Sequence, residues 1–113
     1  VVRHTTFNTE RLVAATQHGF IDATVLAEYL VGKGVPFREA HQHVGTLVSA
    51  CEKQGWELGE MPLDGLRAVC DRIENDVFDY LGAANVVRRY RSEGNSGAES
   101  TRKQVAYWRE VLK

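Results

Sequence analysis

The expected fold is decided by residues 36–55, PFREAHQHVGTLVSACEKQG. Pro36 has the fixed φ that suits the first turn of a helix, and Gly55 can adopt the left-handed conformation that ends one. Between them, apolar side chains recur every three or four residues and define one face of a helix: Phe37, Ala40, Val44, Leu47, Val48 and Cys51. Gly45 lies in the middle of this helix. A glycine there costs about 1 kcal/mol relative to alanine, so we expect a neighbouring helix to pack closely against it.

Helical spacing extends outward from this segment in both directions, and no strand-like alternation persists beyond a few residues. The pattern predicts helices over residues 9–18, 23–33, 61–69, 75–81 and 84–91, and a last helix from residue 98 after a loop at 92–97. We therefore expect an all-α fold, a compact bundle of about five to six helices. At 113 residues the chain suits a single domain spanning 1–113.

Polar and apolar residues at the predicted helix ends suggest specific local contacts. The expected contacts are an N-cap by Asn8 or Thr9, an N-cap by Asp22, a hydrophobic staple between Ile21 and Leu26, and a capping box between Ser96 and Glu99.

The composition narrows the possible partners. The net charge is −1, which does not favour nucleic acid as a partner. Residues 88–103 contain five basic side chains and only two acidic ones. Within this stretch, the run Arg88-Arg89-Tyr90-Arg91 places an aromatic residue among arginines, as some RNA-binding segments do. We expect this stretch to be a solvated or interface face, with RNA binding as the alternative. No apolar run approaches the length of a membrane span, and no charged-then-apolar leader marks a signal peptide.

The cysteines and histidines do not form a metal-ligating pattern. Cys51 and Cys70 lack a short metal spacing and are expected to be buried thiols in a reducing compartment, although the sequence alone leaves a disulfide open. His41 and His43 are two residues apart, so on a helix they point in different directions. We expect His41 to be partly buried and hydrogen-bonded. The alternative, a general base, lacks an acid partner that the sequence reveals.

Two runs of residues resemble a known family. Residues 33–41, KGVPFREAH, followed by Val44-Gly45, match the C-terminal segment of argininosuccinate lyases residue for residue, and residues 23–31, ATVLAEYLV, resemble the helix that precedes it there. The resemblance extends to residues 8–12, 75–77 and 89–104 and so covers the whole chain. The departures are Val25, where the family usually has aspartate, Ile73 in place of a phenylalanine, and Asn95 in place of a glycine.

The resemblance implies a place in the fumarase/aspartase superfamily. Its members are homotetramers built on a long central helical bundle, and argininosuccinate lyases eliminate arginine from argininosuccinate to leave fumarate. The family's base-bearing serine loop and its threonine-histidine segment lie on other parts of the chain and are not found in this sequence. We therefore expect no catalytic, cofactor-binding or metal-binding residue here, a chain that is inactive alone, and a cytoplasmic location. Its expected partners are the remainder of a lyase chain and the homotetramer, with the small-molecule substrate bound only by the full enzyme.

An alternative remains, a stand-alone binding or regulatory module that uses the same fold. The only methionine is Met61, so Val1 is not an initiator, and we expect the chain to be a piece of a longer protein. Separation from a central bundle would then leave apolar side chains uncovered. The expected exposed residues are Val1, Val2, Phe7 and Tyr29.

Overall fold

Helices α2 (Ala23–Gly32) and α3 (Phe37–Gln54) form much of the hydrophobic core of the structure, a computed structural model that describes all 113 residues. They are joined by a tight turn in which Gly34 adopts a φ of +87°, a conformation that suits glycine because it has no Cβ. Their buried side chains recur at helical spacing: Leu26, Ala27, Tyr29 and Leu30 from α2, and Ala40, Val44, Leu47 and Cys51 from α3. The helix expected from residues 36–55 is confirmed.

Two expectations about the faces of α3 are wrong. Gly45 is exposed, and a Cβ placed on it would meet no atom within 4 Å. It lies about 100° around the helix from the buried Val44 and so faces away from α2. Phe37 is 68% exposed, because helical side chains lean toward the N-terminus and the first residue of α3 therefore leans away from the body of the helix.

Three short elements complete the core: the 3-10 turns η2 (Leu58–Glu60) and η3 (Asn75–Asp79), and helix α4 (Leu63–Val69). They contribute fully buried side chains, as does the link between α4 and η3: Leu58, Leu66, Ile73 and Val77. The helix expected over 75–81 is thus a 3-10 turn, which ends before the chain turns at Gly82 with a φ of +90°. The two cysteines are buried and free, as expected.

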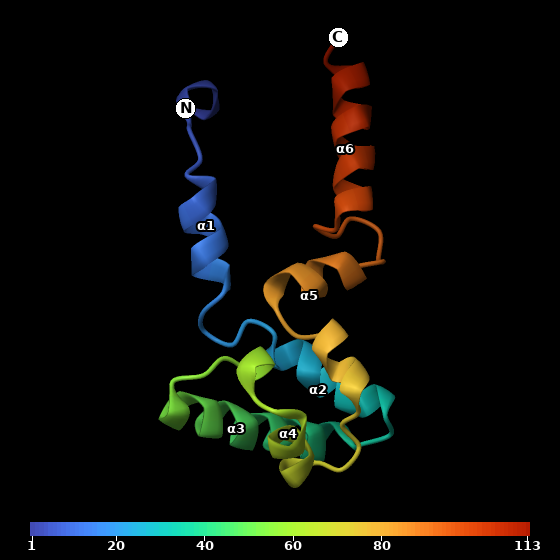
Figure 1. The fold of residues 1–113 in the computed structure, drawn as a ribbon. Coiled ribbons are helices and arrows are strands. Elements are labelled where there is room, and N and C mark those ends of the chain that lie inside the picture. Colours follow the sequence, from blue (N-terminus) through green and yellow to red (C-terminus); the bar gives the residue numbers. More distant parts are fainter.

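Two helices, α1 (Thr9–Thr16) and α6 (Ala98–Val111), extend from the same side of this core (Figure 1). Neither contains a buried residue. The turn η1 (Val2–His4) precedes α1, and α5 (Ala83–Arg89) leads from the core to the loop before α6. The radius of gyration is 17.5 Å, against about 13 Å for a compact domain of this length. Compact packing is therefore concentrated in the middle of the chain.

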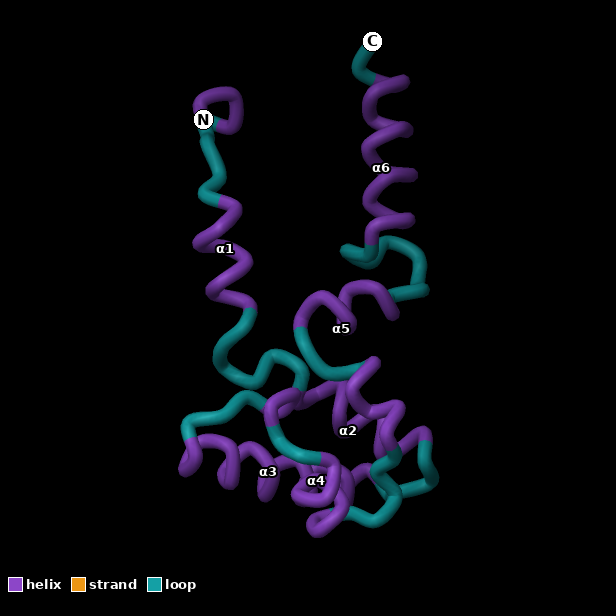
Figure 2. Tube along the Cα trace, viewed as in Figure 1, coloured by secondary structure: helices purple, strands orange, loops and turns teal.

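Helices, turns and loops account for all of the secondary structure (Figure 2). The expected all-α fold with about five to six helices is confirmed, since the chain has six α-helices and no strand.

Both expected N-cap positions are confirmed, but only one of the two side chains bonds to its own helix. The Oδ1 atom of Asn8 accepts a hydrogen bond from the backbone N–H of Arg11 at 2.9 Å, which satisfies a free donor at the start of α1. Asp22 precedes α2, but its carboxylate accepts from the backbone N–H of Gly82 at 2.7 Å. Asp22 is therefore the N-cap residue of α2 by position, while its side chain ties α2 to the start of α5.

The expected capping box does not form. Ile21 is 52% exposed and Leu26 is fully buried, and the staple between them stays a prediction. The N-cap of α6 is Gly97, one residue later than expected. Ser96 therefore precedes the N-cap and Glu99 occupies the second helical position, so the pair does not hold the N-cap and third helical positions that a capping box requires.

Candidate functional site

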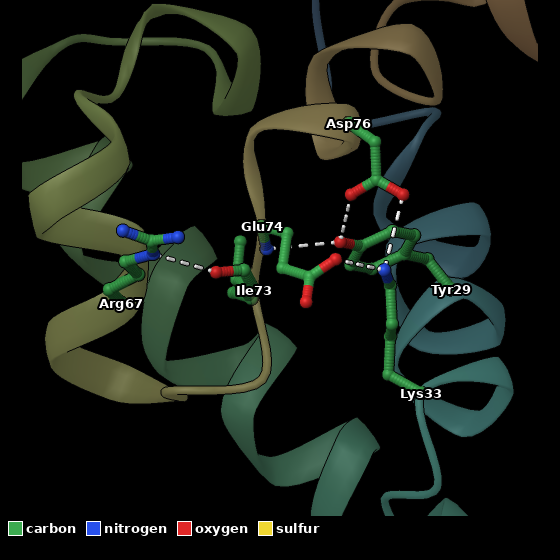
Figure 3. Close-up of polar contacts among 6 residues, drawn as sticks. All are labelled: Tyr29, Lys33, Arg67, Ile73, Glu74 and Asp76. Atoms are coloured by element: carbon green, nitrogen blue, oxygen red, sulfur yellow. Dashed lines mark hydrogen bonds and ion pairs between the residues drawn. The ribbon is translucent and has the colours of Figure 1, made fainter.

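A cluster of polar side chains joins the C-terminal half of α2 to the segment that begins η3 (Figure 3). Tyr29 and Lys33 are four residues apart on α2 and face the same side. The hydroxyl of Tyr29 donates to Oδ1 of Asp76 at 2.6 Å and accepts from the backbone N–H of Glu74 at 3.1 Å. The Nζ atom of Lys33 lies 2.6 Å from Oε2 of Glu74 and 3.2 Å from Oδ2 of Asp76.

Neighbouring contacts hold this cluster in place. Nζ of Lys33 is 5.3 Å from the centre of the Tyr29 ring. On the other side, Nε of Arg67 in α4 donates to the carbonyl of Ile73 at 2.9 Å. The backbone that carries Glu74 and Asp76 is thereby fixed between α4 and α2.

The cluster shifts the pKa of three side chains. A hydrogen bond to Glu74 is the largest cause that raises the pKa of Lys33, and Asp76 adds to it. The hydroxyl of Tyr29 is the main group that lowers the pKa of Asp76, with Lys33 contributing as well. Burial, followed by the hydrogen bond to Asp76, raises the pKa of Tyr29.

These directions indicate what the cluster does chemically. A general acid or base that works near neutral pH needs a pKa close to that pH. Here the pKa of Lys33 and of Tyr29 rises further above neutrality, and that of Asp76 falls further below it. The arrangement stabilises a fixed set of charges and hydrogen bonds, so it acts as a clamp between α2 and η3.

This clamp was not predicted from the sequence. Its two halves are more than 40 residues apart in the chain. A signal was present, because a tyrosine and a lysine at four-residue spacing on a helix can share an acidic partner. Nothing in the sequence showed that Glu74 and Asp76 would be that partner.

The four histidines do not form a common site. His41 is exposed and its ring stacks on Phe37 with 6.3 Å between ring centres, without a hydrogen bond. The expectation that it is partly buried and hydrogen-bonded is wrong, because its neighbour Phe37 lies outside the core. Nδ1 of His18 lies 3.1 Å from Oε1 of Glu57, a contact between residues 39 positions apart that the sequence could not reveal. No three His, Cys, Asp or Glu side chains of the chain are grouped as metal ligands would be; that no metal binds stays a prediction.

The basic residues at the end of α5 are partly engaged within the chain. Cζ of Arg89 lies 3.4 Å from the centre of the Tyr80 ring, and Nη1 of Arg91 donates to the carbonyl of Arg88 at 2.8 Å. Arg88 and Arg89 lie in the last turn of α5, where the helix dipole favours cations. These side chains therefore have structural contacts within the chain that do not require a nucleic-acid partner.

Helices α1 and α6 present uncovered apolar side chains. On α6, Val105, Trp108 and Leu112 follow at three- and four-residue spacing and are 43%, 51% and 77% exposed. Other exposed apolar residues near the N-terminus are Val1, Val2, Phe7, Leu12 and Val13, so exposure of the first three is as expected. The expected exposure of Tyr29 is wrong, since it is 4% exposed. None of the helices has the length and apolar content that crossing a bilayer requires.

Comparisons with known proteins agree on one family. A family model described as "Argininosuccinate lyase C-terminal" matches residues 20–88. The chain is 44% identical over 106 residues, 94% of its length, to the argininosuccinate lyase of Nitratidesulfovibrio vulgaris strain Hildenborough, and 40% identical over the same share to the chloroplastic argininosuccinate lyase of Arabidopsis thaliana. It spans only 23% and 20% of those two relatives. The argininosuccinate lyase of Streptococcus agalactiae serotype V is 41% identical over 96% of this chain, which spans 23% of it.

Proposed function

The chain belongs to the family of argininosuccinate lyase C-terminal domains, and on that premise we propose that it is the C-terminal structural domain of an argininosuccinate lyase. The complete enzyme would cleave argininosuccinate to arginine and fumarate by elimination. The identity of 44% over 94% of the chain supports this assignment. The chain spans 23% or less of each relative compared, so most of the length of those relatives lies outside the matched region.

We further propose that the partner of this domain is the remainder of a lyase chain within a homotetramer. One observation carries this proposal: α1 and α6 project from the core with no buried residue. Helices of 8 and 14 residues are marginal in water without tertiary packing. An apolar stripe that includes Trp108 and Leu112 at the surface is typical of an interface that another segment covers.

The domain itself would have a structural role. The family's base-bearing serine loop and its threonine-histidine segment are not found in these 113 residues. The polar clamp around Tyr29 has pKa directions that suit a structural link. The 113 residues therefore form a single domain that is inactive alone, in a cytoplasmic enzyme whose small-molecule substrate binds elsewhere in the assembly. The two free cysteines are consistent with that reducing location.

A reconstitution experiment tests the proposal. The lyase of Nitratidesulfovibrio vulgaris, truncated to remove the region that matches this chain, is mixed with the purified 113 residues, and fumarate release from argininosuccinate is measured. We expect no release by the chain alone and recovery in the mixture. Fumarate release by the chain alone, above a blank, would contradict the structural assignment.

Matched variants of α6 identify the surface involved. Replacing Trp108 and Leu112 together by serine should reduce recovery at least about tenfold, since large apolar side chains dominate interfaces. Glu110→Ser, on a different side of the same exposed helix, should leave recovery unchanged. Neither change touches a buried residue. Equal recovery by both would show that α6 does not contact the remainder of the lyase, whereas no recovery with the unchanged chain would favour the stand-alone module.

A further inference from the structure

A hollow of about 430 Å³ lies between α2, the end of η3 and the last turn of α5. The side chains from α2 that line it follow helical spacing and so form one wall: Val25, Glu28, Tyr29 and Lys33. Tyr80, Val86, Arg89 and Tyr90 contribute to the rest of the lining. The hollow combines apolar side chains with charged groups, the composition that ligand sites usually have.

Arg89 is held at this hollow by an aromatic stack. Its Cζ atom lies over the Tyr80 ring, 3.4 Å from the ring centre, which is a cation–π contact. Tyr80 in turn meets Tyr29 edge-on, with 4.8 Å between ring centres, and Tyr29 is fixed by its bonds to Asp76 and Glu74. The position of the guanidinium is therefore supported by contacts within the chain.

The stack leaves the hydrogen-bond donors of Arg89 available. The guanidinium carries five N–H groups, and none of those of Arg89 donates to another group of this chain. The other cation of the hollow, Lys33, is already paired with Glu74 and Asp76. Arg89 is thus the cation of the hollow whose donors are free for a ligand.

The negative groups of the hollow limit which anion can bind. Glu28 and Asp76 also line it, and Glu28 has no ion pair in the chain. A second negative charge on a ligand would lie near these carboxylates and be repelled. A ligand with one carboxylate and an apolar remainder fits the lining better than a dianion or a phosphate.

We propose that this hollow binds a small organic monocarboxylate, whose charged end pairs with Arg89 and whose apolar part lies against Val25 and Val86. The carboxylate would accept two N–H bonds from the guanidinium, the geometry that arginine offers to carboxylates. This inference does not rest on the proposed function, since it uses only the residues of the hollow.

Titration of the 113-residue chain with sodium benzoate, followed by NMR, tests the proposal. The signals observed are the Arg89 Nε–H and the ring protons of Tyr80. We expect saturable shifts with a Kd of about 1 mM, the range for one partly exposed ion pair with limited apolar contact. Benzamide, the neutral analogue of the same shape, and succinate, a dianion, should shift these signals at least about tenfold less at equal concentration and ionic strength.

Two neighbouring arginines provide a matched pair of variants. Arg89→Gln should abolish the benzoate response at Tyr80, while Arg88→Gln, next in the chain but not part of the lining, should retain it. Both residues are exposed, and circular dichroism checks that both variants fold. Equal responses to benzoate and benzamide in the unchanged chain, or equal loss in both variants, would show that the hollow has no carboxylate receptor.

Discussion

Gly45 is an exposed glycine in the interior of a long helix, with open space where its Cβ would be. Gly45→Ala should therefore stabilise the chain by up to about 1 kcal/mol, since alanine loses less backbone entropy in a helix. A thermal unfolding curve measures the change. Gly55→Ala is the control, because Gly55 has a φ of +70° and alanine there should lower stability by about 1 kcal/mol. A lower melting temperature for Gly45→Ala would show an unfavourable contact at that face.

Tyr29 contributes hydrogen bonds to the clamp through its hydroxyl. Tyr29→Phe removes the bond to Asp76 and the acceptor for the backbone N–H of Glu74 while keeping the buried ring. We expect a loss of about 1–3 kcal/mol in the free energy of unfolding, measured with urea. Tyr107→Phe should have no effect, because Tyr107 is 58% exposed and makes no hydrogen bond. Equal stability of the two variants would mean that water replaces the clamp at no cost.

The charge on Asp76 makes the clamp sensitive to acid. Folding lowers the pKa of this carboxyl, mainly through the hydroxyl of Tyr29 and then Lys33. A carboxyl of this kind stabilises the fold above its ordinary pKa of 3.8 and loses that contribution as the pH falls through the folded value. Asp76→Asn should therefore be less stable than the unchanged chain at pH 7, and the difference should shrink as the pH falls below 3.8 and through the folded pKa.

Urea unfolding at several pH values measures this difference. Glu93→Gln is the control, since Glu93 is exposed and has no ion pair, and it should match the unchanged chain throughout. A difference for Asp76→Asn that persists unchanged into strong acid would show that the carboxylate charge is not what stabilises the clamp.

At the scale of elements, α2 and α3 differ from α1 and α6 in what their apolar faces contact. The apolar residues of α2 and α3 are buried against each other and against Leu58, Leu66 and Val77. The apolar residues of α1 and α6 contact little else in the chain. The same amphipathic pattern therefore places apolar residues in the core in α2 and α3, and on the surface in α1 and α6.

The end of α5 is the element that could suggest RNA binding. We expect no salt-sensitive binding of single-stranded RNA up to about 100 µM protein in about 0.15 M salt. The reasons are the net charge of −1 and the hydrogen bond that Arg91 donates to the carbonyl of Arg88. Fluorescence anisotropy measures binding. Affinity that falls with added salt and is lost in an Arg88, Arg89 and Arg91 triple alanine variant would contradict the prediction.

At the scale of the whole molecule, the uncovered faces bear on self-association. The exposed apolar side chains of α1 and α6, and Phe7 before them, form association sites when no partner is present. We expect the chain to be monomeric when dilute and to pair weakly at high concentration, because each projecting helix offers only a narrow stripe. Sedimentation over a wide concentration range measures this. A tight tetramer at the lowest measurable concentration would place the assembly information within these 113 residues.

Much of the helical pattern was predictable because it depends on local chemistry. The helix after Pro36, its end at Gly55 and the N-cap at Asn8 each follow from the preference of one residue for one backbone conformation or one hydrogen bond. The predictions for Gly45 and His41 failed because they concerned which face another element would cover. Likewise, the carboxylate of Asp22 at the N-cap of α2 bonds to Gly82, 60 residues away, and not to its own helix.

The sequence by itself determined the all-α class, most of the helix positions, the buried thiols and, through residues 23–45, the family resemblance. Only the tertiary structure decided the rest: the clamp of Tyr29, Lys33, Glu74 and Asp76, the stacking of Arg89 on Tyr80, and the uncovered faces of α1 and α6. The physical reason is the sequence distance over which each kind of interaction acts. Helix formation depends on residues within about four positions of each other, whereas ion pairs, ring stacking and burial depend on groups that only the folded chain brings together.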